Sequence, residues 1–172
     1  MIPTDFATGC KGLSAFVIAD LHLGDERVAR ARGFADAAAM TVEIMAQWCE
    51  RVSQRDTVYL LGDVAKRGHL CSLRALRGEK HLVCGNADDI RHAINAGIFA
   101  SVAITRWLPQ FMLTHIPVHP SQLRDGMINV HGHLHRASIP DARYRCVSVD
   151  QTGFAPVPLL SLISAVAQKR AL

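Results

Sequence analysis

The sequence lacks the features that mark several large classes of protein. No apolar stretch approaches the ~20 residues that a membrane-spanning helix needs, so no membrane association is expected. Residues 1–10 contain no basic region followed by an apolar stretch, so we expect no signal peptide. Lysine and arginine form no dense run although the formal net charge is +4, so the sequence predicts no dedicated DNA-binding surface.

Cysteine is present, but not in the patterns that indicate a disulfide framework or a zinc site. The five cysteines are widely spaced and odd in number, and none belongs to a Cys-x-x-Cys motif. Such cysteines are typical of reduced thiols in a cytoplasmic protein, several of them acting as small core residues. The sequence therefore predicts a cytoplasmic protein in which the reduced thiols are Cys10, Cys49, Cys71, Cys84 and Cys146.

The length and composition are those of one globular domain. The chain has 172 residues, of which 49% are hydrophobic and 20% charged, and this is enough apolar material for a sizeable core. No linker, internal repeat or low-complexity segment interrupts it, so we predict a single domain over residues 1–172. The composition leaves the oligomeric state open.

Five short apolar runs each end abruptly at an acidic, amide or histidine residue. Continuous apolar runs of this length are typical of strands that are buried on both faces. The runs cover residues 15–19, 58–61, 81–84, 111–114 and 127–130. The polar residues that follow them are Asp20, Asp63, Asn86, His115 and His133.

Helical patterns lie between several of these runs. Residues 34–52 carry one apolar stripe. Shorter helices are expected over residues 69–77, 88–96 and 159–168. Residues 101–107 and 111–114 are expected to form a hairpin, and residues 145–149 a late strand. Alternating strands and helices predict an α/β domain, in which ligands collect at the carboxyl ends of the strands, so the polar residues should meet at one edge.

Two pairs of residues have a spacing that suits metal binding. Asp20 and His22 are two positions apart, and on an extended segment such residues point to the same side. His133 and His135 have the same spacing within Gly-His-Leu-His, just after a predicted buried strand. Each pair alone also suits a solvated surface loop, so the pairs gain weight only from their place after an apolar run.

The other candidate ligands are weak signals when each is taken alone. Asp63 follows a glycine and would equally suit a turn in which it caps a helix. Asn86 also follows a glycine and would suit a simple turn, although its amide oxygen is a ligand for hard cations. His115 alone would be a hydrogen-bonded core or loop histidine.

Taken in order, the motifs Asp-x-His, Gly-Asp, Gly-Asn, His and Gly-His-x-His resemble those of the calcineurin-like metallophosphoesterase superfamily, specifically its small single-domain members. The resemblance covers nearly the whole chain, from residue 16 to residues 156–159. It implies an α/β fold of two packed β-sheets flanked by helices. It also implies a site for two divalent metal ions, whose ligands would be Asp20, His22 and His135 for the first ion, Asn86, His115 and His133 for the second, and Asp63 for both.

The resemblance further implies a phosphoesterase in which a metal-bridging hydroxide attacks the substrate. Two metal ions ~3.5–4 Å apart clamp a phosphoryl group and lower the pKa of the water between them. The mixed oxygen and nitrogen ligands favour Mn²⁺, with Fe²⁺, Zn²⁺ and Ni²⁺ as alternatives. Asp63 and Asn86 are thus predicted to be catalytic, and Asn86 is also predicted to contact the substrate, a phosphate ester with nucleotides among the candidates.

One position departs from the family pattern. Many relatives read Gly-Asn-His-Asp at the third motif, where this chain reads Gly85-Asn86-Ala87-Asp88. The missing histidine can protonate a leaving group, and loss of such an acid costs ~10²–10⁴ in rate. The cost is smaller for leaving groups of low pKa, so we predict a phosphodiesterase over a phosphomonoesterase. His119 is the predicted replacement acid, with a solvent-exposed loop histidine as the alternative.

Two further choices stay open at the level of sequence. Arg27, Arg30 and Arg32 follow the first motif, and they either contact substrate phosphates or belong to the solvated start of a helix. A retromer subunit uses this fold as a scaffold, so a catalytically weak or inactive binding module is the competing hypothesis. The complete set of ligand types favours the enzyme, whereas Ala87 favours the scaffold. DNA nucleases of the superfamily usually carry capping elements for which this chain has no room.

Overall fold

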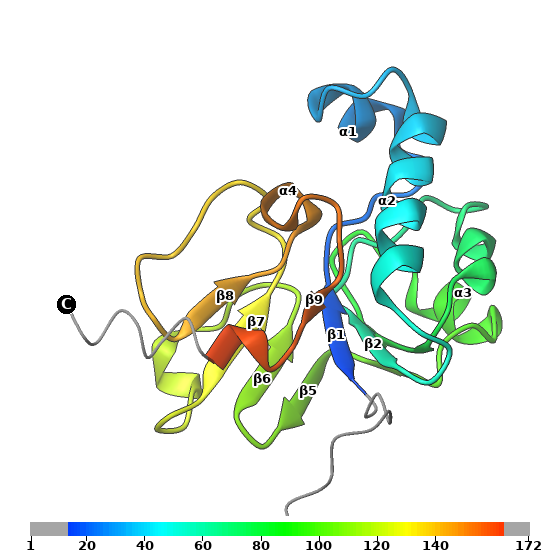
Figure 1. Cartoon of the computed structure of the whole chain (residues 1–172). Helices are drawn as coiled ribbons and strands as arrows, with labels where there is room; N and C mark the ends of the chain where they lie inside the picture. The colour runs from blue at the N-terminus through cyan, green and yellow to red at the C-terminus, as the bar shows by residue number, and fades with distance from the viewer. Residues whose placement is uncertain (1–13, 164–172) are drawn as a thin grey trace, which may run out of the picture.

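The computed structural model of the protein describes residues 14–163, which form two β-sheets with helices around them (Figure 1). The first sheet has five strands in the order β4-β3-β2-β1-β9. Strands β1 to β4 run parallel to one another, whereas β9 pairs antiparallel with β1. Their bounds are Ala15–Ile18 for β1, Thr57–Leu60 for β2, Glu79–Val83 for β3, Ser101–Ala103 for β4 and Val157–Pro158 for β9.

The second sheet has four strands in the order β5-β6-β7-β8. Strands β5 and β6 form an antiparallel hairpin, while β6, β7 and β8 run parallel. Their bounds are Thr105–Leu108 for β5, Phe111–Thr114 for β6, Ile128–His131 for β7 and Tyr144–Cys146 for β8. Each of the five apolar runs of the sequence overlaps a strand, and the expected fold of two packed sheets flanked by helices is confirmed.

Strand β1 shows how the core is divided between the layers. Phe16 and Ile18 are buried in the cluster that joins the first sheet to the helices, whereas Val17 and Ala19 are buried in the cluster that joins the two sheets. Successive side chains of a strand point to opposite faces, so a strand in a central layer must be apolar throughout. The continuous apolar runs therefore reflect a sheet that is covered on both sides.

Helix α2 (Ala37–Arg51) covers the face of the first sheet that points away from the second sheet (Figure 1). Asp36 begins the helix as its N-cap, and its carboxylate accepts a backbone N–H at 2.7 Å. The side chains that are fully buried at every fourth position are those of Met40, Ile44 and Trp48. The helix expected over residues 34–52 is thus confirmed, and its apolar stripe packs on the sheet.

Two short helices flank the same sheet. Helix α3 (Ile90–Asn95) lies within the helix expected after the third motif, and the Asp89 carboxylate caps its first turn. Residues 69–77 form a 3₁₀ helix, η1 (Leu70–Ala75), where a regular helix was expected. The segment is only six residues long, and 3₁₀ helices are typical of such short connecting pieces. The second 3₁₀ helix, η2 (Pro120–Gln122), lies after β6.

The strand expected over residues 101–107 is divided between the two sheets, so the prediction of one continuous strand is wrong. Strand β4 pairs with β3, whereas β5 pairs with β6. Ile104 lies between them with 65% of its surface exposed, which marks the point where the chain passes from one sheet to the other. The hairpin itself is confirmed, because β5 and β6 pair over their full length.

The chain also forms two helices near the strand ends that the sequence did not clearly indicate. Helix α1 (Glu26–Ala31) follows the first motif. The late strand expected over residues 145–149 is β8, which ends earlier, at Cys146, and α4 (Val149–Thr152) begins where the strand was expected to end. A helix was also expected over residues 159–168; residues 161–163 are helical, and residues 164–168 lie outside the described residues. Within residues 14–163, no helix is long and apolar enough to cross a membrane.

Candidate metal centre

The seven predicted metal ligands come together at the carboxyl ends of strands β1, β2, β3, β6 and β7. Five of the seven have a left-handed backbone, with φ between 49° and 67°. This conformation costs a non-glycine residue ~1–2 kcal/mol, so the surrounding structure must impose it. The five residues are Asp20, His22, Asp63, His133 and His135.

Two glycines allow the ligand loops to approach one another closely. A Cβ atom on Gly62 would lie 2.5 Å from His115 Nδ1, and the φ of +81° at Gly62 also favours glycine. A Cβ atom on Gly132 would lie 2.7 Å from Asp20 Oδ2. Any side chain at either position would therefore push a ligand out of place.

Asp20, His22 and His135 form a first group, whose ligand atoms all lie within 4.8 Å of one another. Asp20 is fully buried, and its two carboxylate oxygens accept the backbone N–H of His133 at 3.1 and 3.0 Å. His22 Nε2 is buried without a hydrogen-bond partner in the part of the chain that the structure describes. Burial lowers the pKa of His22, although Asp63 acts in the opposite direction. A buried imidazole with an unused lone pair beside carboxylates fits a divalent cation.

Asp150 orients His135 within this group. His135 Nδ1 donates to Asp150 Oδ2 at 2.9 Å, which leaves Nε2 free to bind a cation. Asp150 also accepts from Arg32, whose Nη2 lies 2.6 Å from Oδ2 and whose Nε lies 3.2 Å from Oδ1. Burial alone would raise the pKa of Asp150, but the hydrogen bonds from Arg32 and His135 outweigh it and hold that pKa at about 2. The carboxylate is therefore charged at neutral pH.

Arg32 is a buried residue, so it does not belong to the solvated start of a helix, and contact of its guanidinium with substrate stays a prediction. Its side chain is only 2% exposed, and its guanidinium also donates to the carbonyl oxygens of Asp20 at 2.7 Å and Leu21 at 3.3 Å. Arg32 and Asp150 are 118 positions apart in the sequence, so no short motif indicates the pair. Both residues support the candidate metal centre, and the sequence indicated this role for neither of them.

His115, Asn86 and Asp63 form a second group. His115 Nδ1 donates to the carbonyl of Leu61 at 2.8 Å, so Nε2 carries the lone pair when the imidazole is neutral. That nitrogen lies 2.9 Å from Asn86 Oδ1 and 3.5 Å from Asp63 Oδ1. Three lone pairs facing one another are unfavourable unless a cation or a proton lies among them. The ring of His133 lies beside them, with its centroid 5.1 Å from that of His115.

Asp63 belongs to the second group and also faces the first. Its Oδ2 is 3.7 Å from His22 Nε2, and its Oδ1 is 3.5 Å from His115 Nε2. Oδ1 also accepts the backbone N–H of Ala87 at 2.9 Å. The ligand atoms of Asp63, Asp20 and His115 also lie within 4.8 Å of one another, so Asp20 of the first group is close to both Asp63 and His115. This position is the one that a carboxylate bridging two cations would take.

Asp88 holds the second and third motifs together, and sequence reasoning treated it only as part of a helix start. Its carboxylate accepts the backbone N–H groups of Asp63 at 2.9 Å, Val64 at 3.0 Å and Gly85 at 2.8 Å. These three hydrogen bonds fix the loop that carries Asp63 against the loop that carries Asn86. The place of Asp88 directly after Gly-Asn-Ala was the available signal for this role.

The predicted acid His119 lies in its own exposed loop. Its Nδ1 is 2.9 Å from the hydroxyl oxygen of Ser121 and accepts the backbone N–H of the same residue at 3.3 Å. The ring thereby caps η2, and these hydrogen bonds are not with the ligand groups. Its role as an acid stays a prediction.

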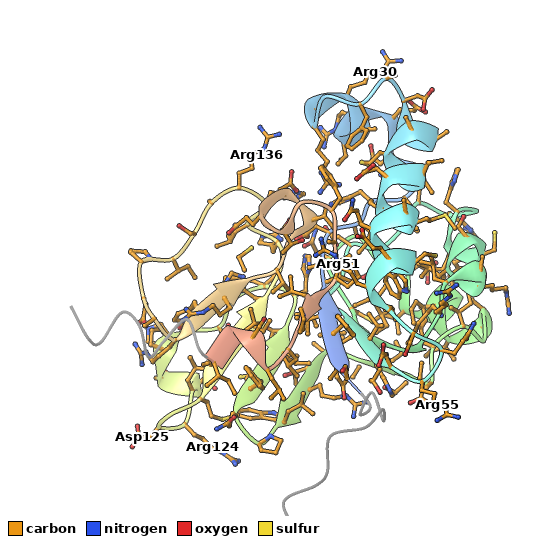
Figure 2. The ribbon with its side chains drawn as sticks, in the orientation of Figure 1. Arg30, Arg51, Arg55, Arg124, Asp125 and Arg136 are labelled. Atoms are coloured by element: carbon orange, nitrogen blue, oxygen red, sulfur yellow. The ribbon has the colours of Figure 1, made fainter. Side chains whose placement is uncertain are left out.

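The two predicted substrate-binding arginines are placed differently. Arg27 lines a cavity next to His135. Arg30 is exposed on α1, and Figure 2 shows its side chain extending away from the rest of the protein. Contact of either arginine with substrate stays a prediction.

The sequence matches a family model over residues 13–151, described as the calcineurin-like phosphoesterase superfamily domain. The chain therefore belongs to the calcineurin-like phosphoesterase superfamily. It is also 27% identical over 170 residues to the Gene 66 protein of Mycobacterium phage D29, an alignment that covers 76% of this chain and 85% of that protein. Together with the ligand groups, family membership defines a metal-dependent phosphoesterase.

Two solved structures are similar to this one. A protein of unknown function from Aquifex aeolicus, AQ665, has a TM-score of 0.72 and 20% identity, and the match covers 90% of this chain and 100% of that one. The nuclease MPE from Pseudomonas putida has a TM-score of 0.47 and 21% identity, covering 70% of this chain and 61% of that one. The first shows that the fold is shared, and the second is too distant to carry an argument.

Proposed function

We propose that the protein is a phosphodiesterase that uses two divalent metal ions, with Mn²⁺ preferred, and that it acts in the cytoplasm. The observation that carries the proposal is the position of Asp63, whose two carboxylate oxygens face His22 Nε2 at 3.7 Å and His115 Nε2 at 3.5 Å. A carboxylate whose two oxygens face histidines of both ligand groups suits a bridging role. The cytoplasmic location is supported by the free thiols of Cys49, Cys71, Cys84 and Cys146.

The residues of the site prepare it to bind cations and a phosphate ester. Two divalent ions held here would act as Lewis acids on the phosphoryl oxygens and lower the pKa of a water molecule. Asp20 and Asp63 contribute two negative charges, so the loaded site keeps a net positive charge that attracts a phosphate anion. Leu61 and Asp150 accept the Nδ1 protons of His115 and His135, and this would leave both Nε2 lone pairs free to hold cations.

The diester preference is supported by the surroundings of Ala87. Its methyl group cannot donate a proton, and its backbone N–H is already donated to Asp63 Oδ1 at 2.9 Å. A substrate whose leaving group has a low pKa needs little help from an acid. An aryl diester meets this condition and carries one negative charge. We therefore expect a higher kcat/KM for an aryl phosphodiester than for the matched aryl monoester.

The competing function is a binding scaffold with weak or no catalysis, and Ala87 is the feature that favours it. The test is hydrolysis of bis(p-nitrophenyl) phosphate and p-nitrophenyl phosphate by Mn²⁺-reconstituted protein, combined with elemental analysis. The enzyme should bind about two ions per chain, because one carboxylate bridges two sites in such centres. It should hydrolyse the diester with the higher kcat/KM. Full metal loading with no hydrolysis of either ester would favour the scaffold, and preference for the monoester would refute the diesterase.

Asp63→Asn is the variant that tests the metal centre itself. Asparagine tolerates the left-handed backbone at this position, so the fold should persist while the charge is lost. Hydrolysis should fall by at least about 10²-fold, since the loss of preorganised charge stabilisation costs that much. Asp125→Asn is the matched control, because Asp125 is exposed at the end of the molecule far from α1 (Figure 2). Normal turnover and metal content in Asp63→Asn would refute the bridging role.

A further inference from the structure

A cavity of about 550 Å³ lies beside the metal centre and shares His135 with it. Helix α1 forms one wall, and the segment that follows the Gly-His-x-His motif forms the other. This volume is within the range of ~300–1,000 Å³ that is usual for small-molecule sites. The residues that line the cavity are Arg27, Val28, Ala31, Arg32, Leu134, His135, Arg136, Ala137 and Asp150.

The cavity carries an excess of positive charge. Asp150 and Arg32 neutralise each other at its base, at 2.6 Å and almost without exposure. Arg27 is exposed and forms no hydrogen bond or ion pair with any other residue between 14 and 163. Arg136 is 70% exposed, and its ion pair with Asp150 is long, at 3.8 Å, whereas Arg32 binds that carboxylate at 2.6 Å. Arg27 and Arg136 are therefore available to an anion.

The two arginines stand on different walls. Arg27 belongs to α1, whereas Arg136 comes directly after His135, and Figure 2 shows Arg136 at the same end of the molecule as α1. Two contacts join the walls at this point, from Arg136 Nη2 to the carbonyl of Ala31 at 3.5 Å and between Arg32 Nη2 and His135 Nδ1 at 3.4 Å. Guanidinium groups on facing walls suit one phosphate held between them.

The remaining walls are apolar. Val28 and Ala31 lie on one side, and Leu134 and Ala137 lie on the other. Such walls favour the uncharged carbon-rich part of a ligand, and the polar groups at the rim select its charged end. The cavity therefore suits a molecule that combines an apolar segment with an anionic group.

From this geometry we propose that the cavity binds the part of the substrate that is not cleaved, and that this part carries a second phosphate held by Arg27 and Arg136. The inference rests on the proposed function, because it assumes that the phosphate that is cleaved binds at the metal ligands, next to His135. The substrate class is then a phosphodiester that carries a second phosphate on a carbon-rich segment, as in a short oligonucleotide.

The test compares the binding of thymidine 3′,5′-bisphosphate with that of thymidine 5′-monophosphate, measured by calorimetry on Mn²⁺-loaded protein. The two probes differ only in the second phosphate. Wild type should bind the bisphosphate at least about tenfold more tightly, since hydrogen bonds to charged groups have this magnitude. Arg27→Ala and Arg136→Ala should each reduce that preference at least about threefold, whereas Arg27→Lys and Arg136→Lys should keep part of the charge and part of the preference.

Arg55→Ala is the matched control for non-specific attraction. Arg55 is also an exposed arginine, but it lies at the amino end of β2, opposite the metal ligands (Figure 2). It should leave the preference for the bisphosphate unchanged. Equal loss of preference in Arg55→Ala would overturn the inference, because it would show attraction by net charge alone. A wild-type preference below about twofold would overturn it as well.

Hydrolysis of bis(p-nitrophenyl) phosphate separates this inference from the proposed function. If wild type hydrolyses that diester but shows no preference for the bisphosphate, the cavity proposal fails and the phosphodiesterase proposal stands. The opposite result is that wild type hydrolyses no ester but prefers the bisphosphate, and that Arg27→Ala and Arg136→Ala lose this preference. The cavity proposal then stands as a binding site, and the phosphodiesterase proposal fails. Thermal unfolding of each variant checks that the fold is retained.

Discussion

Replacement of Asp150 by asparagine should destabilise the protein and weaken its metal binding. The change keeps the size of the side chain and removes its negative charge. Arg32, whose side chain is 2% exposed, would then lose its anionic partner, and His135 would lose the carboxylate that accepts its Nδ1 proton. Both effects follow from one atom, because Oδ2 of Asp150 accepts from Arg32 at 2.6 Å and from His135 at 2.9 Å.

The expected loss of stability is about 2–3 kcal/mol. Breaking a buried ion pair by removing one partner costs about 3–5 kcal/mol, and the hydrogen bonds of Arg32 to two backbone carbonyls keep the cost near the lower limit. The pKa of Asp150 leads to a similar value, since the difference between its usual 3.8 and about 2 corresponds to about 2 kcal/mol. In a domain of this size such a loss lowers Tm by about 4–12 °C.

The assay has two parts. Thermal unfolding of metal-free protein at neutral pH measures the stability change without any contribution from bound cations. Calorimetric titration with Mn²⁺ then measures metal affinity, which should fall about 10–100-fold because His135 is no longer held in orientation. Asp125→Asn removes an exposed carboxylate and should change stability by no more than about 0.5 kcal/mol.

The pH dependence provides a further check on the cause. The folded pKa of Asp150 is lower than its unfolded value, so its stabilising effect is fully present above pH 3.8 and is lost as pH falls toward 2. The difference in stability between wild type and Asp150→Asn should therefore narrow over that interval. A variant with unchanged Tm and unchanged metal affinity at neutral pH would refute the reasoning.

Three other predictions follow from the site and its surroundings. Mn²⁺ at about 100 times its Kd should raise Tm by about 5–10 °C, as expected for a ligand that binds only the folded state, and no shift at that concentration would exclude tight binding. Ala87→His should increase kcat/KM for the aryl monoester more than for the diester. His119→Ala should slow the hydrolysis of esters with poor leaving groups most if His119 is the acid. A variant that changes the hydrolysis of all esters equally would argue against an acid at the substituted position. Burial raises the pKa of Cys84 to about 11, so at pH 8 a thiol reagent should modify Cys49 and Cys71, which are exposed, and leave Cys84 unmodified in the native protein.

The sequence by itself determined the layers of the fold and the edge where the ligands meet. Apolar runs without alternation indicate strands that are covered on both faces, as Phe16 and Val17 show by packing on opposite sides of β1. A polar residue after such a run must lie at the carboxyl end of a strand, and in parallel sheets these ends lie together. The placement of Asp20, Asp63 and His115 within reach of one another follows from this rule.

Only the tertiary structure decided which residues support those ligands. Arg32 meets Asp150 across 118 positions, and Asp88 reaches back to the backbone of Asp63 across 25, so neither partnership leaves a local pattern in the sequence. The passage of the chain between sheets at Ile104 depends in the same way on which neighbour each strand finds. Local sequence determines propensity and burial, whereas hydrogen bonds between distant segments depend on the packing of the whole chain.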